Sequence, residues 1–577
     1  MNSLFTYYDL EVFKHDWLAV FIDDEGTITK MHNDRSALER FLSSVNYLVG
    51  YNNYNYDDKI IASILKGVDP YETSKKIISG KRFNLKLQKP LSLDVMQELK
   101  GLSLKEVQAN LSKSIIETPV DFHINRPLGK QEIEDTFKYC TNDVLTTKEV
   151  FEERESYFAS KLEMIREFKL SATSVKKTIA NLAAEVLKAK PSHDSDRLHI
   201  TYDYRLPKHE LPTAVVDFYN EIEKRFKKGE NHELLEREKL TYQLAGIDHI
   251  YGFGGLHAAK EQYQGEGNYM QIDIASYYPS LILNNGFADN INMDTYKQIY
   301  HQRQQLKLSK DSKEEVYKRI LTSVYGSMKS KYNKLYNPRQ ANNIVVNGQL
   351  IMTHLICLLE RFAELIQTNT DGIIVRYEKG FEKNIIKLLE LFEKHYDLKF
   401  EIDLITKIAQ RDVNNYVIQY RDGSIKAKGR FANYEGGNFA RNSYAVIDKA
   451  LVDYYIHGKR INETVINLWK KRQFNYFQLV AKAGKFDGMA QEIKEDTLLE
   501  GTYSSYFNNL QQVNRIFATK DRYLGSVYKT KKDKETKYNK VPYTSENCFV
   551  WNDELKRLDK RKINLNWYIK QVEGWLF

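Results

Sequence analysis

Two carboxylates near the amino terminus, Asp9 and Glu11, lie two positions apart in an apolar and aromatic run over residues 4–12. If this run is a strand, alternation directs both side chains to one face, where they are costly unless a cation lies between them. Asp57 and Asp143 are two further acids that could complete such a site. Carboxylates without a His/Cys set favour Mg²⁺ or Mn²⁺ over zinc. Two such ions can activate a water and stabilise the leaving oxygen of a phosphodiester, so the pattern predicts phosphodiester hydrolysis.

A second pair of acids lies in the middle of the chain. Asp273 ends an apolar run and is followed by Ile-Ala-Ser-Tyr-Tyr-Pro, with a turn expected at Pro279, and Asp371 lies in Asn-Thr-Asp-Gly before the strand-like residues 373–377. Two carboxylates brought together from separate strands could hold two Mg²⁺ ions for attack of a primer 3′-hydroxyl on an α-phosphate.

Basic side chains lie between these two acids, on helical patterns over residues 294–309 and 313–328. Arg303 and Lys307 are four positions apart and share a face, and Lys318 precedes Tyr325 by two turns. A single cation of this kind usually belongs to a solvated face. In this setting we expect all three to converge on the negative charge of a triphosphate.

The elements that must position these residues are of mixed type. The pattern predicts a hairpin of two strands over residues 4–12 and 17–22. With a helix over 131–154, it indicates an α/β amino-terminal domain that ends near residue 165. We expect a long helix over residues 159–190, a mostly helical connector over 200–245, a strand-like run over 269–283 and a helix over 347–366. The carboxy-terminal part is rich in lysine and tyrosine, and no architecture can be assigned to it from the pattern.

Composition limits the class of protein. The chain has 577 residues, of which 42% are hydrophobic and 28% charged, with 10 Pro and 28 Gly, so it is globular and too long for one core. The apolar stretch over residues 350–359 contains His354 and is too short to span a bilayer. No secretory signal is visible, and three cysteines far apart in the sequence indicate a reducing, cytoplasmic location without a disulfide framework.

The net charge of +9 is partly concentrated in residues 520–540, where eight basic and three acidic residues occur. Such a field attracts a polyanion, although a solvated basic loop explains the run equally well. The lysines singled out as nucleic-acid contacts in this run are Lys531, Lys532 and Lys534.

The acids of the amino-terminal part occur in three segments that together resemble a known family. Asp-x-Glu, Asn-x-x-x-Asp and Tyr-x-x-x-Asp, in that order, are similar to the three motifs of the 3′–5′ proofreading exonuclease domain of DNA polymerases, an RNase H-like fold. The resemblance implies Asp9, Glu11, Asp57 and Asp143 as metal ligands and Tyr139 as the residue that positions the attacking water. It also implies that Asn53 contacts a single-stranded 3′ end. Residues 121–129 are similar to their counterpart in bacteriophage members of family B, but the catalytic lysine of that branch cannot be placed.

The central motifs resemble those of family B DNA polymerases. Residues 273–279 resemble Asp-x-x-Ser-Leu-Tyr-Pro, which implies that Tyr278 excludes a ribose 2′-hydroxyl. Residues 318–326 resemble Lys-x-x-x-Asn-Ser-x-Tyr-Gly, with Thr322 in place of Asn, and imply that Tyr325 packs under the nascent base pair. Residues 369–372 resemble Asp-Thr-Asp-Ser, but Asn369 replaces the first acid and Gly372 the serine. The retained pair Asp273 and Asp371 is the one the resemblance makes essential.

Weaker matches flank these motifs. Residues 251–255 resemble a Tyr-x-Gly-Gly linker, and Asn414-Asn415-Tyr416 occupies the place of a Lys-x-Tyr motif, so that only the tyrosine is retained. Residues 426–429 are a plausible backbone contact for a primer–template duplex. The DNA contacts implied by these segments are Tyr251, Gly254, Gly255, Tyr416, Lys426 and Lys428.

The resemblance implies an α/β multidomain protein with an RNase H-like exonuclease domain and a right-hand polymerase that has short helical fingers. The corresponding boundaries are exonuclease 1–165, connector 166–245, palm 246–292 and 329–430, fingers 293–328, and thumb with the carboxy-terminal region 431–577. It also implies two Mg²⁺ or Mn²⁺ ions per site, and primer–template DNA and dNTPs as partners. The expected setting is a bacteriophage or mobile element in a bacterial cytoplasm, without a membrane partner.

The gaps between Asp273 and Lys318 and between Gly326 and Asn369 look too short for the two insertions of the protein-primed branch. We therefore expect a polymerase that uses no terminal protein and that depends on an accessory partner for processivity, unwinding or priming. Two alternatives stay open at this point. One is a primase-like enzyme that starts chains with a partner subunit, and the other is a non-catalytic primer–template-binding protein with a decayed palm.

Overall fold

The computed structural model describes residues 1–577 apart from 1–3, 82–84, 100, 194–195, 497–502 and 534. The amino-terminal domain is built on a five-stranded sheet of order β3-β2-β1-β4-β5. Its strands are β1 (Phe5–Val12), β2 (Trp17–Asp23), β3 (Ile28–His32), β4 (Tyr47–Gly50) and β5 (Leu91–Asp94). The predicted hairpin is confirmed, because β1 and β2 pair antiparallel. The next two pairings, β1 with β4 and β4 with β5, are parallel.

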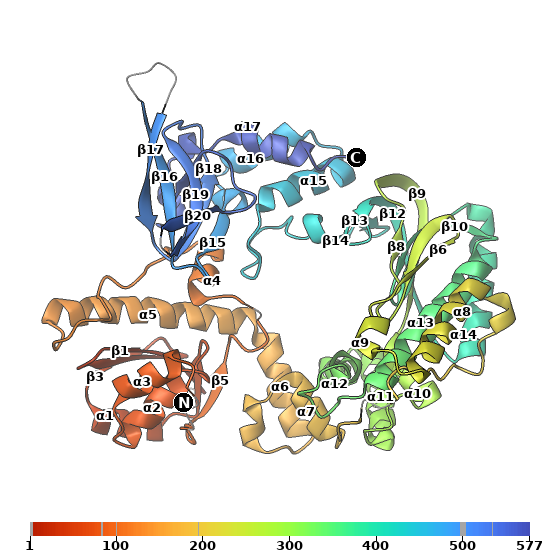
Figure 1. The fold of residues 1–577 in the computed structure, drawn as a ribbon, viewed down its shortest axis with the longest axis horizontal. Helices are drawn as coiled ribbons and strands as arrows, with labels where there is room; N and C mark the ends of the chain where they lie inside the picture. Colours follow the sequence, from red (N-terminus) through yellow and green to blue (C-terminus); the bar gives the residue numbers. More distant parts are fainter. Residues whose placement is uncertain (1–3, 82–84, 100, 194–195, 497–502, 534) are drawn as a thin grey trace.

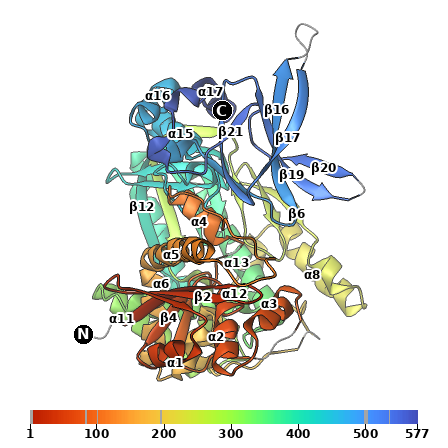
Figure 2. The same ribbon diagram turned by 90° about the vertical axis from the view of Figure 1, so that its left-hand side faces the viewer.

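Helices cover both faces of this sheet. The helices α1 (Arg35–Ser43), α2 (Asp57–Leu65) and α3 (Pro70–Ile78) lie on one side, and the long helix α5 (Lys130–Glu153) lies across the other (Figures 1 and 2). Because both faces are covered, the apolar strand β2 is buried along nearly its whole length. The structure confirms the helix expected over residues 131–154.

The predicted continuous helix over residues 159–190 is wrong. Helix α6 (Glu155–Glu167) ends, a 3₁₀ turn (Ala172–Lys176) follows, and α7 (Ile179–Val186) begins anew. The breaks lie at hydroxyl residues that cap helix starts: the Ser171 side chain accepts from the Thr173 amide and the Thr178 side chain from the Asn181 amide. Beyond them lie α8 (Thr213–Lys227), the short α9 (His232–Leu235) and a hairpin of β6 (Leu240–Leu244) and β7 (Ile247–Tyr251), so residues 200–245 contain a strand as well as helices.

The largest described sheet has seven strands, in the order β14-β13-β12-β9-β11-β10-β8. Its described strands are β8 (Ala258–Ala259), β9 (Tyr263–Ile274), β10 (Ala363–Asn369), β11 (Gly372–Tyr377), β12 (Phe400–Asp412), β13 (Asn415–Tyr420) and β14 (Ile425–Lys428). Helices α13 (Pro338–Leu359) and α14 (Glu382–Tyr396) pack on one face (Figure 1). By length and composition alone α13 could cross a membrane, but 89% of its apolar window is buried inside the protein, so it is a core helix.

Two sequence expectations in this region need correction. The strand-like run over residues 269–283 divides into the end of β9 and helix α10 (Tyr277–Asn285). Ser276 adopts a left-handed conformation at φ +52°, and Pro279 falls in the first turn of α10, where the missing amide hydrogen is no loss, so the expected turn at Pro279 is wrong. Helix α13 begins earlier than predicted because Asn337 caps it and Pro338 occupies its first position. Residues 363–366 belong to β10 and not to the helix.

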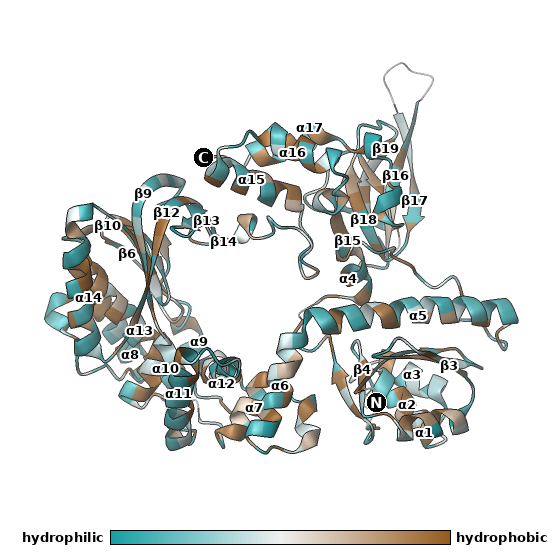
Figure 3. Ribbon diagram, turned by 180° about the vertical axis from the view of Figure 1, so that it is seen from behind, coloured by the Kyte–Doolittle hydropathy of each residue, from teal (hydrophilic) through white to brown (hydrophobic). Residues whose placement is uncertain are grey.

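The two charged helices are confirmed as α11 (Met293–Leu308) and α12 (Glu314–Ser327). Figure 3 shows the contrast between the mostly hydrophilic α11 and the largely hydrophobic α13 beside it. This difference agrees with burial, because α13 is enclosed on all sides whereas α11 packs on only part of its surface.

The carboxy-terminal domain has its own core and two small sheets, of order β15-β18-β21 and β17-β16-β19-β20. The first contains β15 (Leu479–Lys482), β18 (Val513–Ala518) and β21 (Cys548–Val550), and the second β16 (Gly488–Asp496), β17 (Tyr503–Leu510), β19 (Leu524–Lys532) and β20 (Thr536–Lys540). Helices α15 (Ala445–His457), α16 (Ile461–Lys470) and α17 (Leu565–Glu573) complete it (Figure 2). This architecture could not be predicted from the sequence.

Candidate active sites

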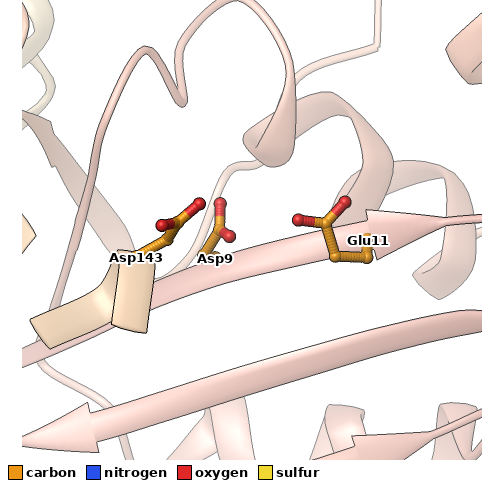
Figure 4. A group of neighbouring side chains, drawn as sticks. All are labelled: Asp9, Glu11 and Asp143. Carbon is orange, nitrogen blue, oxygen red and sulfur yellow. The ribbon is translucent and has the colours of Figure 1, made fainter. Parts of the chain in front are cut away.

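An acidic cluster lies on the amino-terminal sheet. Asp9 and Glu11 extend from β1 and Asp143 from α5, and one oxygen of each lies within 4.8 Å of the others (Figure 4). Asp57 is the first residue of α2 and is also buried. The structure thus brings together acids that are up to 134 positions apart in the chain.

Burial and mutual repulsion disfavour the charged forms of these acids. Desolvation, followed by the Asp143 charge, raises the pKa of Asp9 to about 7. Desolvation and the charges of Asp9, Asp143 and Asp57 raise the pKa of Glu11 well above its usual value, and burial with the Asp9 charge does the same for Asp57. A hard divalent cation would relieve this repulsion, and an all-oxygen donor set within this spacing fits Mg²⁺ or Mn²⁺.

Tyr139 lies one helical turn before Asp143 on α5, and burial together with the Asp143 charge raises its pKa. Lys105, from helix α4 (Leu104–Asn110), lies between the two: its Nζ is 2.6 Å from Asp143 Oδ1 and 4.2 Å from the centre of the Tyr139 ring. Gln108 donates to the same Asp143 oxygen at 2.7 Å. Sequence reasoning missed Lys105. The available signal was Ser-x-x-Glu at residues 103–106, which marks a capped helix start next to a lysine.

Asn53 does not present its side chain to solvent as its expected role requires. It is fully buried, and its amide donates to Asp58 at 3.2 Å. In this conformation the Asn53 amide supports the start of α2, and the expected contact with a single strand stays a prediction.

The two central acids lie side by side in the seven-stranded sheet. Asp273 is the penultimate residue of β9, and its partner across the ladder is Gly372, the first residue of β11. Asp371 immediately precedes Gly372, and its carbonyl accepts from the Ile274 amide at 2.7 Å. Burial raises the pKa of Asp273 to about 6, and the Asp371 charge contributes to this rise.

A side chain at position 372 would clash with Asp273, which explains the glycine there. A Cβ at position 372 would lie 1.8 Å from Asp273 Oδ1 and 2.9 Å from its Cγ. Gly255 is similar, because a Cβ there would lie 2.0 Å from Thr370 Oγ1, in the turn that carries Asp371. Both glycines therefore permit close approach around the acidic pair.

The expected DNA contacts near this pair differ in exposure. Lys426 and Lys428 are exposed, two positions apart on β14, and the Lys426 charge lowers the pKa of Asp273. Tyr416 is buried beneath Lys428, with the Lys428 Nζ 5.9 Å from its ring centre. Burial, followed by the charges of Asp273 and Asp371, raises the pKa of Tyr416, so this side chain borders the acidic pair.

The segment before the sheet needs a further correction. Tyr251 is fully buried at the end of β7, and its hydroxyl pairs with Thr353 at 2.8 Å, so it does not face DNA. Gly254 is exposed and has open space where a Cβ would lie.

Two half-buried tyrosines lie beside the acids. The rings of Tyr278, on α10, and Tyr325, on α12, have centroids 4.2 Å apart and planes tilted by 51°. Residues from two motifs that are far apart in sequence thus form one aromatic contact.

The three expected triphosphate cations do not converge on one acceptor. Arg303 is buried, with Nε 2.7 Å from Glu314 Oε1 and a hydrogen bond to the Ser276 hydroxyl. Lys307 pairs with Glu401, the residue opposite Asp273 on β12. Lys318 is exposed, with Nζ 3.4 Å from Glu315. Each cation has its own carboxylate in this conformation, and the expected convergence on a triphosphate stays a prediction.

Lys531 and Lys532 are exposed at the end of β19, and the Lys531 Nζ lies 3.8 Å from Asp487. Lys534 lies outside the described residues.

The chain was compared with known protein families, curated sequences and solved structures. No family model and no curated protein sequence matches the chain. Among solved structures, a family B DNA polymerase from the hyperthermophilic archaeon Pyrobaculum calidifontis is similar over 99% of this chain and 77% of its own, with a TM-score of 0.45 and 11% identity. A likeness of this extent assigns no role to any residue, so the roles of the side chains rest on their own geometry.

Proposed function

We propose that this protein is a template-directed DNA polymerase with a separate 3′–5′ exonuclease site. The observation that carries the proposal is the adjacency of Asp273, on β9, and Asp371, in the turn just before the paired strand β11. The same sheet also carries Lys426 and Lys428. The second acidic cluster, with Asp9 as a member, lies in another domain and supports a second phosphodiester activity.

In the polymerase site, Asp273 and Asp371 would hold two Mg²⁺ or Mn²⁺ ions. Bound ions would lower the barrier to phosphodiester chemistry by stabilising charge on the attacking and leaving oxygens. The chain's own residues supply geometry: Tyr278 limits the space beside the incoming sugar, and Tyr325 supports its base pair. Lys426 and Lys428 would contact the duplex backbone.

The three cations of the proposed fingers would bind a triphosphate only after they release their present carboxylate partners. Because Arg303, Lys307 and Lys318 each hold a carboxylate in this conformation, an incoming triphosphate has to exchange with those carboxylates. Lys307 is the most direct candidate, since its partner Glu401 lies opposite Asp273.

In the exonuclease site, Asp9, Glu11, Asp57 and Asp143 would hold the ions. Lys105 and Gln108 fix the Asp143 carboxylate, and Lys105 over the Tyr139 ring fixes the phenol that would orient a water. The proposed division is exonuclease 1–165, connector 166–245, palm 246–292 and 329–430, fingers 293–328 and thumb 431–577. A bacteriophage or mobile-element setting, dNTPs and primer–template DNA as partners, and an accessory factor belong to the same proposal.

The test uses matched and mismatched primers annealed to a template, with Mg²⁺ or Mn²⁺. The wild-type chain should extend the matched primer and shorten the mismatched one. Asp273→Asn should abolish extension and spare shortening, whereas Asp9→Asn combined with Glu11→Gln should do the reverse. Dinucleotide synthesis on a primer-free single strand would favour the primase-like alternative, and extension that survives Asp273→Asn would refute the assignment of the central site.

A further inference from the structure

Helix α4 has two faces that serve different domains. Lys105 and Gln108 are three positions apart and face the acidic cluster, while Glu106, Ala109 and Asn110 face the carboxy-terminal domain. This division follows from helical spacing, because positions 106 and 110 share a side that positions 105 and 108 do not. Figure 2 shows α4 between α5 and the carboxy-terminal sheets.

The contact around Glu106 joins the two domains by charge. Glu106 is buried, caps its own helix start by accepting from the Ser103 amide at 2.8 Å, and pairs with Lys482 at 2.6 Å. Asn442 donates to its second oxygen at 2.9 Å. Lys482, from the carboxy-terminal domain, thus neutralises the charge of Glu106, the residue that follows Lys105.

Arg515 holds the other end of the helix. It is fully buried, and its guanidinium donates to the carbonyl of Ala109 at 3.1 Å, near the end of the helix, and to that of Lys113 at 2.6 Å, in the segment that follows. It also donates to the Asp553 carbonyl at 2.9 Å. Burial lowers the pKa of Arg515 to about 10. A guanidinium can bridge several carbonyls in this way because its donors form a rigid fork.

The segment that follows α4 continues the same docking. The Ile115 amide donates to the Asn552 carbonyl at 2.7 Å, and the Gln512 amide donates to Glu117 at 2.7 Å. Ile115 also packs with Val480 and Val513. Residues 101–117 therefore belong to the amino-terminal part by sequence but are anchored to the carboxy-terminal domain.

We propose that the carboxy-terminal domain holds Lys105 and Gln108 at the acidic cluster through α4, so that strand degradation depends on carboxy-terminal side chains that never touch the strand. Lys482, Arg515 and Asn442 are positioning residues for hydrolysis. This inference rests on the proposed exonuclease, and it adds that the hydrolytic site is complete only while the carboxy-terminal domain is docked on α4.

The test measures three quantities for the full chain: the single-turnover rate of mismatched-end removal, the Kd for single-stranded DNA, and the rate of matched-primer extension. Lys482→Met removes the charge and keeps most of the alkyl chain. Lys485→Met, at an exposed lysine three positions away, is the matched control. Lys482→Arg is the conservative variant, and Lys105→Met provides the background for a double-mutant cycle.

We expect Lys482→Met to slow end removal about tenfold, since a small displacement of positioned groups has effects of this order. The Kd and the extension rate should not change, Lys485→Met should match the wild type, and Lys482→Arg should recover the rate. In the Lys105→Met background, Lys482→Met should cause a smaller loss than in the wild type, because part of its effect passes through Lys105 and the rest through Gln108. If Lys482→Met lowers the melting temperature, Asn442→Ala, which leaves every charge in place, is measured with the same expectation.

Three outcomes would overturn the inference: a Lys482→Met rate equal to the wild type, a parallel loss of extension and end removal, or full additivity with Lys105→Met. The control that separates this failure from failure of the proposed function is Asp9→Asn with Glu11→Gln. If that pair leaves end removal intact, the exonuclease itself is misassigned; if it abolishes end removal while Lys482→Met has no effect, only the role of α4 is wrong.

Discussion

Gly372→Ser would restore the serine found in the polymerase motif that residues 369–372 resemble, and we expect it to destroy primer extension. In this structure the new Cβ would lie 1.8 Å from Asp273 Oδ1. Non-bonded heavy atoms settle near about 3.5 Å, so the Asp273 carboxylate has to move by more than about 1.5 Å. Misplacement of a reacting group by about 1 Å can cost about 10²-fold in rate, so extension should fall by at least that factor.

The loss should be one of function and not of folding, because a carboxylate at the end of a short side chain can rotate away without moving the strand. The assay is single-nucleotide incorporation with a matched primer, together with thermal unfolding and mismatched-end removal, both of which should stay near wild-type values. Gly380→Ser is the control, since a Cβ at position 380 meets nothing within 4 Å. Incorporation by Gly372→Ser at the wild-type rate would refute the placement of Asp273 against Gly372.

Three further predictions test other parts of the molecule. Tyr278→Ala should raise ribonucleotide incorporation relative to deoxyribonucleotide incorporation, measured by paired single-nucleotide assays, because it opens space beside the sugar; an unchanged ratio would remove Tyr278 from this role. Lys531→Ala with Lys532→Ala should weaken duplex binding and flatten the dependence of log Kd on log salt by about two units, and an unchanged slope would contradict the contact. Burial raises the pKa of Asp273 to about 6, above the value of about 3.9 in unfolded chains, so the metal-free fold loses stability as pH rises through this interval. Asp273→Asn should therefore stabilise the chain at pH 8 in a chelator by about 3 kcal/mol, and a lower melting temperature than the wild type would contradict the raised pKa.

The sequence alone determined features that depend on local periodicity. The alternation in β1 placed Asp9 and Glu11 on one face, and the antiparallel pairing of β1 with β2 follows the predicted hairpin. The bounds of β11 and of the two charged helices agree with their patterns to within about two residues. Such features can be predicted because the spacing of apolar residues within about ten positions is enough to indicate a helix or a strand.

Features that depend on distant contacts were decided only by the tertiary structure. Lys105 reaches Asp143 across 38 positions, and no local pattern marks it as part of that site. Tyr251 and Asn53 match motif positions expected to contact DNA, yet packing buries both. Arg303 and Lys307 share a helical face as predicted, but acids on other elements pair with each of them.

The same limit applies to the middle and the end of the chain. In the sequence, the helical spacing of apolar residues continues past Glu167. In the structure, the helix is interrupted and new helical segments begin at Ser171 and Thr178. The hydroxyl of each of these residues accepts a hydrogen bond from a backbone amide at the start of the next segment. In the carboxy-terminal domain the strands are short and pair with partners far away in sequence, so their order is fixed by burial of a shared core. Residue spacing thus determined which side chains could do chemistry. Long-range packing decided which of these side chains lie close together. The reason is that a contact between distant segments produces no repeating pattern of residues in either segment.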